Sequence, residues 1–374
     1  MTDYHILGLM TGTSADGIDL GFITSDGKKI KKFGKQDFFP YDQATQNQIA
    51  SWFGRDDIDP HLSKPATIIT DLHISAILQF LKKHNIDKSS LSAIGFHGQT
   101  IYHAPEKKIT CQLGNGENLA KALHIPVVWQ FRQKDIMMGG QGAPLMPLMH
   151  RAVVDYFQLP LPLMIINIGG VANITLMDKH HIYAGDIAIG NAMIDDYARQ
   201  YLNIPKDEGG KKAMLGKPDK TLLAKWLNDD FFAKPIPKSL DRNYLKSTIN
   251  HDLKDKNHHN NLATLSLFTS QAIATSINRI SRDCAITPTI LLVAGGGRHN
   301  EYVMQHLASQ LQPMILKNLD DAIDKKIADN LEAFGFGFLA SRVMANLPLT
   351  LPTTTGVIAP TMGGRLTMPP HLIT

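Results

Sequence analysis

Four short turns combine glycine with acidic, amide or hydroxyl residues, and each of them follows an apolar run. They span residues 12–17, 169–173, 185–191 and 295–300. Backbone N–H groups in glycine turns bind phosphate oxygens, and a nearby aspartate holds Mg²⁺ directly or through water. The pattern therefore favours a site for phosphate and a cation. It also leaves open four turns that need glycine only for their backbone conformation.

The first of these turns separates the apolar runs 5–10 and 18–24, and it is longer than a hairpin requires. Hairpin loops usually have about two to five residues, whereas this turn runs from Gly12 to Gly17. It combines its glycines with hydroxyls and carboxylates, which are contributed by Thr11, Thr13, Ser14, Asp16 and Asp19.

Several familiar motifs are missing. The segment 210–218 has one residue too many between its glycines for a phosphate-binding loop, and it has Pro218 where a magnesium-binding hydroxyl belongs. The sequence contains neither an HExxH motif nor a GxGxxG motif placed to open a helix after a strand. The adjacent histidines at 180–181 and 258–259 have diverging side chains on a helix or a strand, so we expect them in solvated loops.

Length and composition predict a two-lobed protein that binds neither nucleic acid nor membranes. The chain has 374 residues, more than one core usually supports. Its net charge is only +4 and its basic residues are dispersed. It has no apolar stretch near the roughly 20 residues that span a bilayer, and its first residues are too polar for a signal peptide. The distant Cys111 and Cys284 fit a reducing cytoplasm, where we expect the protein.

Apolar runs and helical stripes alternate along the chain, which predicts an α/β fold with mixed sheets. A strand, a glycine turn and a second strand open the chain at 5–24 and recur at 163–177, which suggests a duplicated fold. The glycine-rich stretch 139–144 marks the expected boundary. We therefore expect a first lobe over 1–138, a second lobe over 139–346, and a tail over 347–374 that packs back on the lobes. Further strands are expected at 29–39, 91–96, 109–113, 126–128, 289–294 and 314–316, and helices at 45–53, 61–84, 117–123, 146–157, 192–202, 262–282, 299–311 and 328–345.

Eight segments together resemble the anhydro-N-acetylmuramic acid kinases, a family within the superfamily of sugar kinases, hexokinase, actin and heat-shock chaperones. The resemblance covers nearly the whole chain in order, and the combination of GTSxDGxD with DxxxGGQGAPL is specific to the family. The segments are GLMTGTSADGID (8–19), FHGQTIYH (96–103), QLGNGENLA (112–120), FRQKDIMMGGQGAPLMP (131–147), NIGGVANIT (167–175), GDIAIGNAMIDD (185–196), AGGGRHN (294–300) and KKIADNLEAFGFGFLA (325–340).

The resemblance implies a two-lobed actin- or hexokinase-like fold, built from duplicated ribonuclease H-like units around a central cleft. It implies an enzyme that uses ATP, Mg²⁺ and water to open the 1,6-anhydro ring of anhydro-N-acetylmuramic acid. The product would be N-acetylmuramic acid 6-phosphate, formed in the recycling of cell-wall amino sugars. A homodimer is the family expectation.

The resemblance also implies residue roles. Asp135 would be the general base that activates water, and Asp16 and Asp186 would hold Mg²⁺. From the residues alone, Asp135 could equally cap a helix or pair with Arg132 or Lys134, and Glu332 could be a solvated helix carboxylate. The residues expected to bind the nucleotide are Gly12, Thr13, Ser14, Asp16, Gly17, Asp19, Asn167, Gly169, Gly170, Asn173, Asp186, Gly190, Asn191, Gly295, Gly296, Gly297 and Asn300. Those expected to bind the sugar are His97, Gln99, Asn115, Glu117, Arg132 and Glu332.

Three departures from the family pattern leave the principal carboxylates in place. Thr11 stands where serine is commoner, 187–189 replaces a Thr-Gly-Pro, and 237–242 is a degenerate copy of a PKSTGRE segment. Two rival functions share the phosphate turns: an actin- or chaperone-like ATPase and a kinase of a different sugar. The ATPase would not need the Asp135 segment, and it should carry a separate partner-binding region, which the sequence does not show.

Overall fold

The computed structural model describes residues 2–12, 14–253 and 257–370, so Thr13 lies outside the described residues. The chain forms two compact units, one of 1–159 with 326–374 and one of 160–325. The expected boundary after residue 138 therefore lies inside the first unit. The physical reason is packing: α5 (Pro147–Phe157) stays with the first unit through ring contacts of Tyr156 and Phe157 with Phe33.

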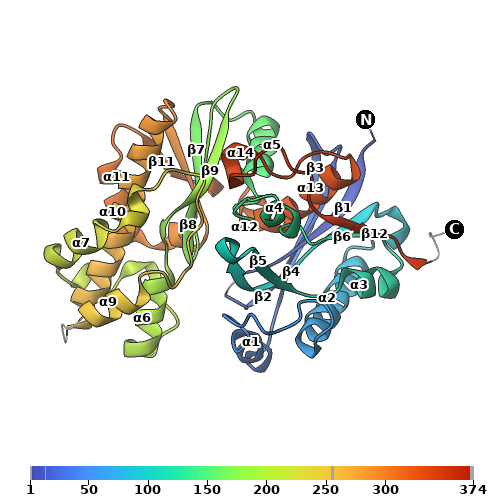
Figure 1. Cartoon of the computed structure of the whole chain (residues 1–374), viewed down its shortest axis with the longest axis horizontal. Coiled ribbons are helices and arrows are strands. Elements are labelled where there is room, and N and C mark those ends of the chain that lie inside the picture. The colour runs from blue at the N-terminus through green and yellow to red at the C-terminus, as the bar shows by residue number, and fades with distance from the viewer. Residues whose placement is uncertain (1, 13, 254–256, 371–374) are drawn as a thin grey trace. The chain divides into compact units, whose positions relative to one another are not determined.

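The first unit contains a seven-stranded mixed sheet. Its strands follow the order β12-β6-β4-β1-β2-β3, and β5 pairs with β4 (Figure 1). The strands β1, β2 and β3 are antiparallel neighbours, whereas β4 is parallel to β1 and β6 is parallel to β4. The strands are β1 (Tyr4–Thr11), β2 (Gly17–Ser25), β3 (Ile30–Pro40), β4 (Ala93–Ala104), β5 (Ile109–Leu113), β6 (Val127–Trp129) and β12 (Arg365–Thr367).

Helices cover both faces of this sheet. The long helix α2 (Lys64–Lys83) begins at Ser63, whose side chain accepts a hydrogen bond from the Ala66 N–H. Its buried side chains share a core with the faces of β1, β2 and β4 that carry Leu7, Leu20 and Phe96. Besides α5, the other helices of this unit are α1 (Gln43–Ala50), α3 (Gly116–Leu123), α4 (Gln133–Met137), α13 (Leu331–Met344) and α14 (Pro352–Thr355).

The opposite face of the sheet carries a row of glycines beneath α13. Gly8 pairs with Gly21 on one side and with Gly95 on the other. A Cβ at Gly8 would collide with the backbone of α13 at Ala333 and Gly337, and one at Gly95 would collide with the backbone of Phe336. The row therefore lets the helix lie directly on the strands.

The second unit repeats the strand order of the first. Its five-stranded sheet runs β11-β10-β7-β8-β9, with β7, β8 and β9 antiparallel in sequence and β10 and β11 parallel to β7. Both units thus have three antiparallel strands followed by two parallel ones on the far side of the first strand. This repetition confirms the predicted α/β fold with mixed sheets and its duplicated, ribonuclease H-like pattern. The strands are β7 (Leu163–Ile168), β8 (Val171–Met177), β9 (Ile182–Ile189), β10 (Ile290–Ala294) and β11 (Ile315–Asn318).

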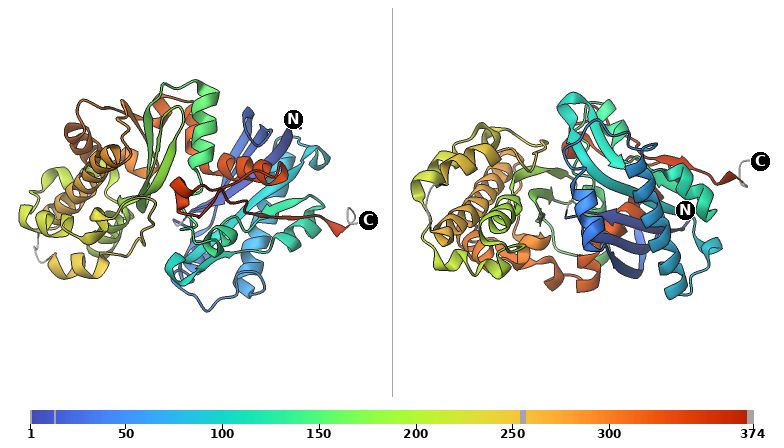
Figure 2. Two further views of the ribbon diagram at one scale, coloured as in Figure 1. Left: turned by 45° about the horizontal axis from the view of Figure 1, so that its top comes forward. Right: turned by 90° about the horizontal axis from the view of Figure 1, so that it is seen from below.

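The longest helix of the chain, α10 (His258–Asp283), packs on β9 of the second unit (Figure 2). The Ser276 hydroxyl of α10 donates to the Ile187 carbonyl at 3.0 Å, and the Thr269 hydroxyl donates to the Gly190 carbonyl at 3.0 Å. These bonds satisfy backbone groups at an edge of the sheet. The other helices of this unit are α6 (Ala192–Leu202), α7 (Lys220–Leu227), α8 (Asp230–Ala233), α9 (Lys246–Asp252) and α11 (Glu301–Gln310). The chain returns to the first unit at α12 (Lys325–Asp329).

Further sequence predictions differ from the structure, and among them His258 and His259 begin α10 rather than lie in a loop. Most of the predicted turn 185–191 is the buried end of β9. The predicted helix 328–345 is interrupted at Asn330, between α12 and α13. The tail 347–374 contains α14, and its strand β12 pairs with β6 at the edge of the first sheet. Among the described residues, no helix combines the length and the apolar character needed to cross a membrane.

Candidate active site

The turn after β1 is fixed by contacts between its residues and β4. The Thr11 hydroxyl donates to the Gly98 carbonyl at 3.0 Å, and the Gln99 amide of β4 donates to the Gly12 carbonyl at 3.1 Å. Within the turn, the Ser14 hydroxyl donates to Oδ1 of Asp16 at 2.7 Å. The described contacts of Gln99 place it against the predicted phosphate turn, and its predicted sugar contact stays a prediction.

Acidic side chains from the first turn and from the start of α13 influence one another. Burial is the main cause that raises the pKa of Asp19 to about 7, and the negative charges of Asp16, Glu332 and Asp329 raise it further. Glu332 itself is exposed at the start of α13. The fold thus brings Glu332 into the electrostatic environment of the hairpin, more than 300 residues away in sequence. Within the described part of the chain, no group of three or more His, Cys, Asp or Glu side chains is placed to hold a metal.

Asp135 is buried, with 1% of its surface exposed, and both of its carboxylate oxygens accept hydrogen bonds. Oδ1 accepts from the Gly142 N–H at 2.6 Å, and Oδ2 accepts from the Thr355 hydroxyl at 2.6 Å. The Thr355 carbonyl accepts from the Gln141 N–H at 2.7 Å. A Cβ at Gly140 would collide with the Asp135 carboxylate, which explains a glycine there. Thr355 was missed in the sequence because nothing local links it to α4.

Arg132 connects this loop to His97. Its Nε donates to Nε2 of His97 at 3.1 Å, and its Nη1 donates to the Gly142 carbonyl at 2.7 Å. Nε2 of His103 lies 3.0 Å from the Gln141 carbonyl on the same loop. Arg132 and His97, both predicted on the sugar side, are therefore adjacent to each other and to the loop that contacts Asp135.

Asn115 and Glu117 have local partners. The Asn115 side chain caps α3 by accepting from the N–H groups of Glu117 and Asn118, and its amide donates to the His61 carbonyl at 3.1 Å. Glu117 is exposed and pairs with Arg365 of β12. These contacts account for both residues structurally, and their predicted sugar contacts stay predictions.

The second unit gathers its predicted nucleotide residues at one end of its sheet. Asn167, Asn173 and Asp186 lie in register on β7, β8 and β9. The Asn191 N–H donates to the Gly169 carbonyl at 2.7 Å, and the Gly190 N–H donates to the Gly170 carbonyl at 2.9 Å. A Cβ at Gly295 would collide with the Asn167 side chain, and one at Gly297 would collide with Ile168. Three of the four glycine-containing segments, at 169–173, 185–191 and 295–300, therefore meet.

Two segments beside these turns were not predicted as part of a site. The Asp186 carboxylate accepts from the Leu240 N–H at 2.8 Å, and the Asp186 N–H donates to the Lys238 carbonyl at 2.9 Å. Burial lowers the pKa of Lys238 to about 8. The only sequence signal for the segment with Lys238 and Leu240 was the degenerate PKSTGRE copy at 237–242. The second segment contains Gly210, where a Cβ would collide with the side chain of Asn300, the residue that caps α11.

Comparison with known proteins gives the family of the chain. The family model for anhydro-N-acetylmuramic acid kinase matches residues 4–369. The chain belongs to the anhydro-N-acetylmuramic acid kinase family. The curated kinases of this family from Rhodopseudomonas palustris (strain BisB18) and Bradyrhizobium diazoefficiens are each 38% identical to it over 371 residues, which cover 97% of this chain and 99% of theirs.

More distant solved structures have low similarity. An activator of 2-hydroxyisocaproyl-CoA dehydratase from Clostridium difficile, with bound ADPNP, matches at a TM-score of 0.43 and 11% identity, covering 91% of this chain and 97% of its own. A ROK family glucokinase from Streptomyces griseus, in complex with glucose and AMPPNP, matches at 0.41 and 10% identity, covering 90% and 98%. By its family, the chain is an enzyme, an ATP-dependent kinase.

Proposed function

We propose that this kinase uses ATP and water to convert anhydro-N-acetylmuramic acid to N-acetylmuramic acid 6-phosphate, a step in the recycling of cell-wall amino sugars. Water would add to the anomeric carbon, O6 would leave that carbon, and O6 would take the γ-phosphoryl group of ATP, which leaves ADP. The family match over residues 4–369 carries the proposal.

The phosphate turns would bind ATP through their backbone N–H groups, and carboxylates would hold Mg²⁺. Mg²⁺ commonly uses one or two protein carboxylates together with substrate phosphates and water. The hairpin fits such an ion, because the pKa of Asp19 is raised partly by the charges of Asp16, Glu332 and Asp329, and a divalent cation relieves that repulsion. We assign Asp16 and Asp186 to the ion. Bound Mg²⁺ would neutralise charge on the transferred phosphoryl group.

Asp135 is proposed as the general base. A positioned base contributes about 10²–10⁴-fold to such a reaction, and the bonds from Gly142 and Thr355 hold this carboxylate in one orientation. The same bonds and its burial support a second, structural role, in which Asp135 ties the 139–142 loop to α14. Each carboxylate oxygen can accept a second hydrogen bond, so as a base Asp135 would bind the attacking water beside these donors.

Incubation with ATP, Mg²⁺ and a panel of amino sugars tests the proposal. We expect a sugar phosphate of the predicted mass from the anhydro sugar, and in H₂¹⁸O the heavy oxygen should be at the anomeric carbon. Phosphorylation of another sugar in preference would replace the proposed substrate, and a product without ¹⁸O would exclude the coupled hydrolysis. A homodimer and a cytoplasmic location are further proposals, and sedimentation of the purified protein tests the first.

A further inference from the structure

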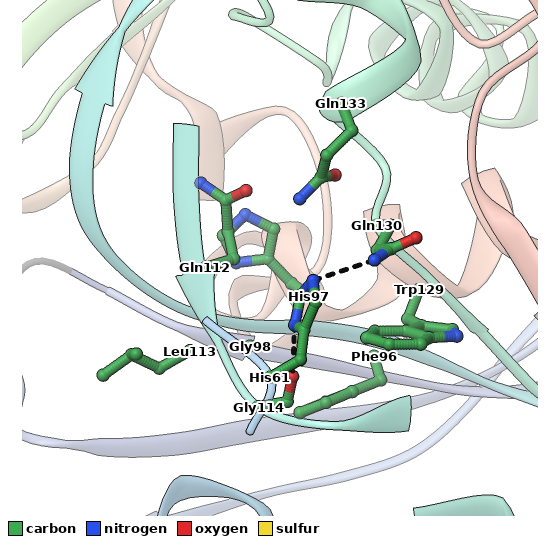
Figure 3. Close-up of a pocket in the computed structure, with 10 residues that line it drawn as sticks. All are labelled: His61, Phe96, His97, Gly98, Gln112, Leu113, Gly114, Trp129, Gln130 and Gln133. Atoms are coloured by element: carbon green, nitrogen blue, oxygen red, sulfur yellow. Dashed lines mark hydrogen bonds between the residues drawn. The ribbon is translucent and has the colours of Figure 1, made fainter. Parts of the chain in front are cut away.

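Buried polar side chains gather at two places outside the phosphate turns. The first is a small pocket of the first unit, whose walls include His97, Gln112 and Gln133 (Figure 3). Polar side chains around so small a space suit one water molecule, because a buried water has about two to four hydrogen-bonding partners. The second place is Lys238 of the second unit, whose partners are groups of the protein itself.

Lys238 has a buried ammonium group. The residue is only 9% exposed, whereas lysine is almost never fully buried unless it is paired. Its Nζ donates to the Phe231 carbonyl at 2.6 Å and to the Lys234 carbonyl at 3.0 Å. Nζ also lies 4.0 Å from the centroid of the Phe231 ring, within the range at which the face of a ring attracts a cation. Lys238 thus binds the C-terminal end of α8.

Lys238 carries its charge at neutral pH although it is buried. Burial lowers its pKa to about 8, the charges of Arg279 and Lys234 act in the same direction, and the charge of Asp186 opposes the decrease. Burying a charge costs stability unless its contacts compensate. Here the two carbonyls and the ring supply those contacts, so the ammonium group anchors the part of the chain that carries it.

The backbone on both sides of this anchor contacts Asp186. The Lys238 carbonyl accepts from the Asp186 N–H at 2.9 Å, and the Leu240 N–H donates to Oδ2 of Asp186 at 2.8 Å. A Cβ at Gly185 would lie 2.8 Å from the Ile236 side chain, so the segment 236–240 lies directly against β9. Because β9 is the last strand of its sheet, this segment occupies part of an open edge.

These contacts connect α8 to the Asp186 carboxylate through a single residue. The segment 236–240 lies outside the helices and strands, so no regular ladder of backbone bonds fixes it. The side chain of Lys238 fixes it instead. The anchoring point is itself held, because Nη1 of Arg279 on α10 donates to the Phe232 carbonyl of α8 at 3.2 Å.

We propose that Lys238 is a positioning residue for Asp186: it ties the segment 236–240 to α8 and thereby holds the Leu240 N–H against the Asp186 carboxylate. The inference rests on the proposed function only in that Asp186 has a task at the nucleotide. A carboxylate that binds a ligand works best when its support holds it within about 0.5 Å of the productive position. Lys238 supplies that support from α8, through the Leu240 N–H.

Hydrogen exchange tests this connection in the full-length protein without any substrate. Lys238→Met keeps a long side chain but removes the ammonium group. Amides of peptides that cover 236–242 should then exchange roughly tenfold faster or more, the effect expected when a hydrogen bond to a charged group is lost. Peptides of α10 should exchange as in the wild type. Lys234→Met removes an exposed ammonium group from the neighbouring end of α8 and is the matched control, which should change neither.

Two results of this measurement would overturn the inference. Unchanged exchange over 236–242 would mean that Lys238 does not hold the segment. Faster exchange that extends over α10 would mean that Lys238 supports the second unit in general.

A double-mutant cycle tests whether Lys238 acts through Asp186. Two quantities are measured: binding of ADP with Mg²⁺ by calorimetry, and kcat/KM for formation of the sugar phosphate. Lys238→Met should lower whichever of these Asp186→Ala lowers, by roughly 10- to 100-fold at most. In the Asp186→Ala background it should have little further effect, because the group that it positions is gone. Losses that simply add would overturn the inference.

Failure of the inference differs from failure of the proposed function. If the wild type forms no sugar phosphate, the proposed reaction fails, while hydrogen exchange and nucleotide binding still decide the role of Lys238. If Asp186→Ala changes neither nucleotide binding nor turnover, Asp186 has no task that Lys238 could serve. The inference then fails while the proposed reaction stands.

Discussion

Asp135 lies where the helix α4 and the loop 139–142 that follows it meet the distant helix α14. Its two oxygens accept from the Gly142 N–H and the Thr355 hydroxyl. An aspartate in this position can act in catalysis directly or by holding the loop in place, and two substitutions separate these roles.

Replacing the carboxylate tests the direct role. Asp135→Asn keeps the size of the side chain but removes a base, so turnover should fall by about 10²–10⁴-fold. Binding of ATP, measured by calorimetry, should be nearly unchanged. If Asp135 only ties the loop, the variant should instead lose stability while its remaining activity keeps the pH dependence of the wild type.

Replacing Thr355 tests the positioning role. Thr355→Val removes a hydrogen bond to a carboxylate, an interaction worth about 1.5–3 kcal/mol, so we expect kcat to fall by roughly 10- to 100-fold. Thr355→Ser keeps the hydroxyl and should restore activity. Thr353→Val makes the same change on the same helix, where no bond to Asp135 exists, and serves as the control. Equal activity of the two valine variants would argue against a positioning role.

Asp19 should give the first unit a distinctive pH dependence. Its folded pKa is about 7 against an ordinary value of 3.8, so between these values the unfolded chain releases a proton that the folded chain retains. Stability should therefore decrease as the pH rises from about 4 to 7, by at most about 1.4 kcal/mol per pH unit from this group. Above pH 7 the contribution is constant.

The difference between the wild type and Asp19→Asn isolates this contribution, because other titrating groups are common to both proteins. Chemical denaturation in EDTA at several pH values should show the variant gaining stability relative to the wild type between pH 4 and 7. A constant difference across that range would mean that Asp19 ionises normally in the folded protein.

At the scale of elements, the glycine row beneath α13 sets how closely the helix approaches the sheet. Gly95→Ala places a methyl group against the backbone of Phe336, which cannot move without shifting the helix. We expect a loss of about 1–3 kcal/mol in the free energy of unfolding, measured by denaturant titration. Gly296→Ala is the control for stability, because no atom lies within 4 Å of its added methyl group. Equal stability of the two variants would contradict the close packing.

The sequence predicted most strands and helices because their apolar periodicity is strong, but β9 shows where that signal fails. Ile182–Ile189 is buried on nearly every residue, so it lacks the alternation of a half-exposed strand. Its Gly185 and Asp186 instead indicated a turn. The glycine lies where a Cβ would meet Ile236, which no local pattern reveals.

The sequence likewise predicted only part of the candidate site. The motifs identified the turns, and the structure brings three of them together in the second unit because their strands are neighbours in one sheet. The partners of Asp135 and Asp186 were not predictable, since Thr355 and Leu240 come from segments that meet these residues only through the tertiary fold. The roles of individual residues stay predictions until the variants are measured.

At the scale of the whole molecule, the two units differ in whether one continuous range of residues forms them. The second unit is continuous over 160–325, and its principal core cluster lies entirely within that range. The first unit needs 326–374 as well, because α13 covers one face of its sheet. We therefore expect the isolated segment 160–325 to unfold cooperatively, as followed by circular dichroism and calorimetry. The isolated segment 1–159 should show no such transition, and cooperative unfolding of that segment would mean that α13 is dispensable.

This arrangement has a consequence for synthesis. At roughly 5–20 residues per second, a ribosome that has finished residue 159 needs about ten to thirty seconds more before it reaches α13. During that interval the glycine-lined face of β1, β2 and β4 has no helix to cover it. The second unit can complete its core before α13 of the first unit has been synthesised. The nascent N-terminal half is therefore the part of this kinase that we expect chaperones to protect.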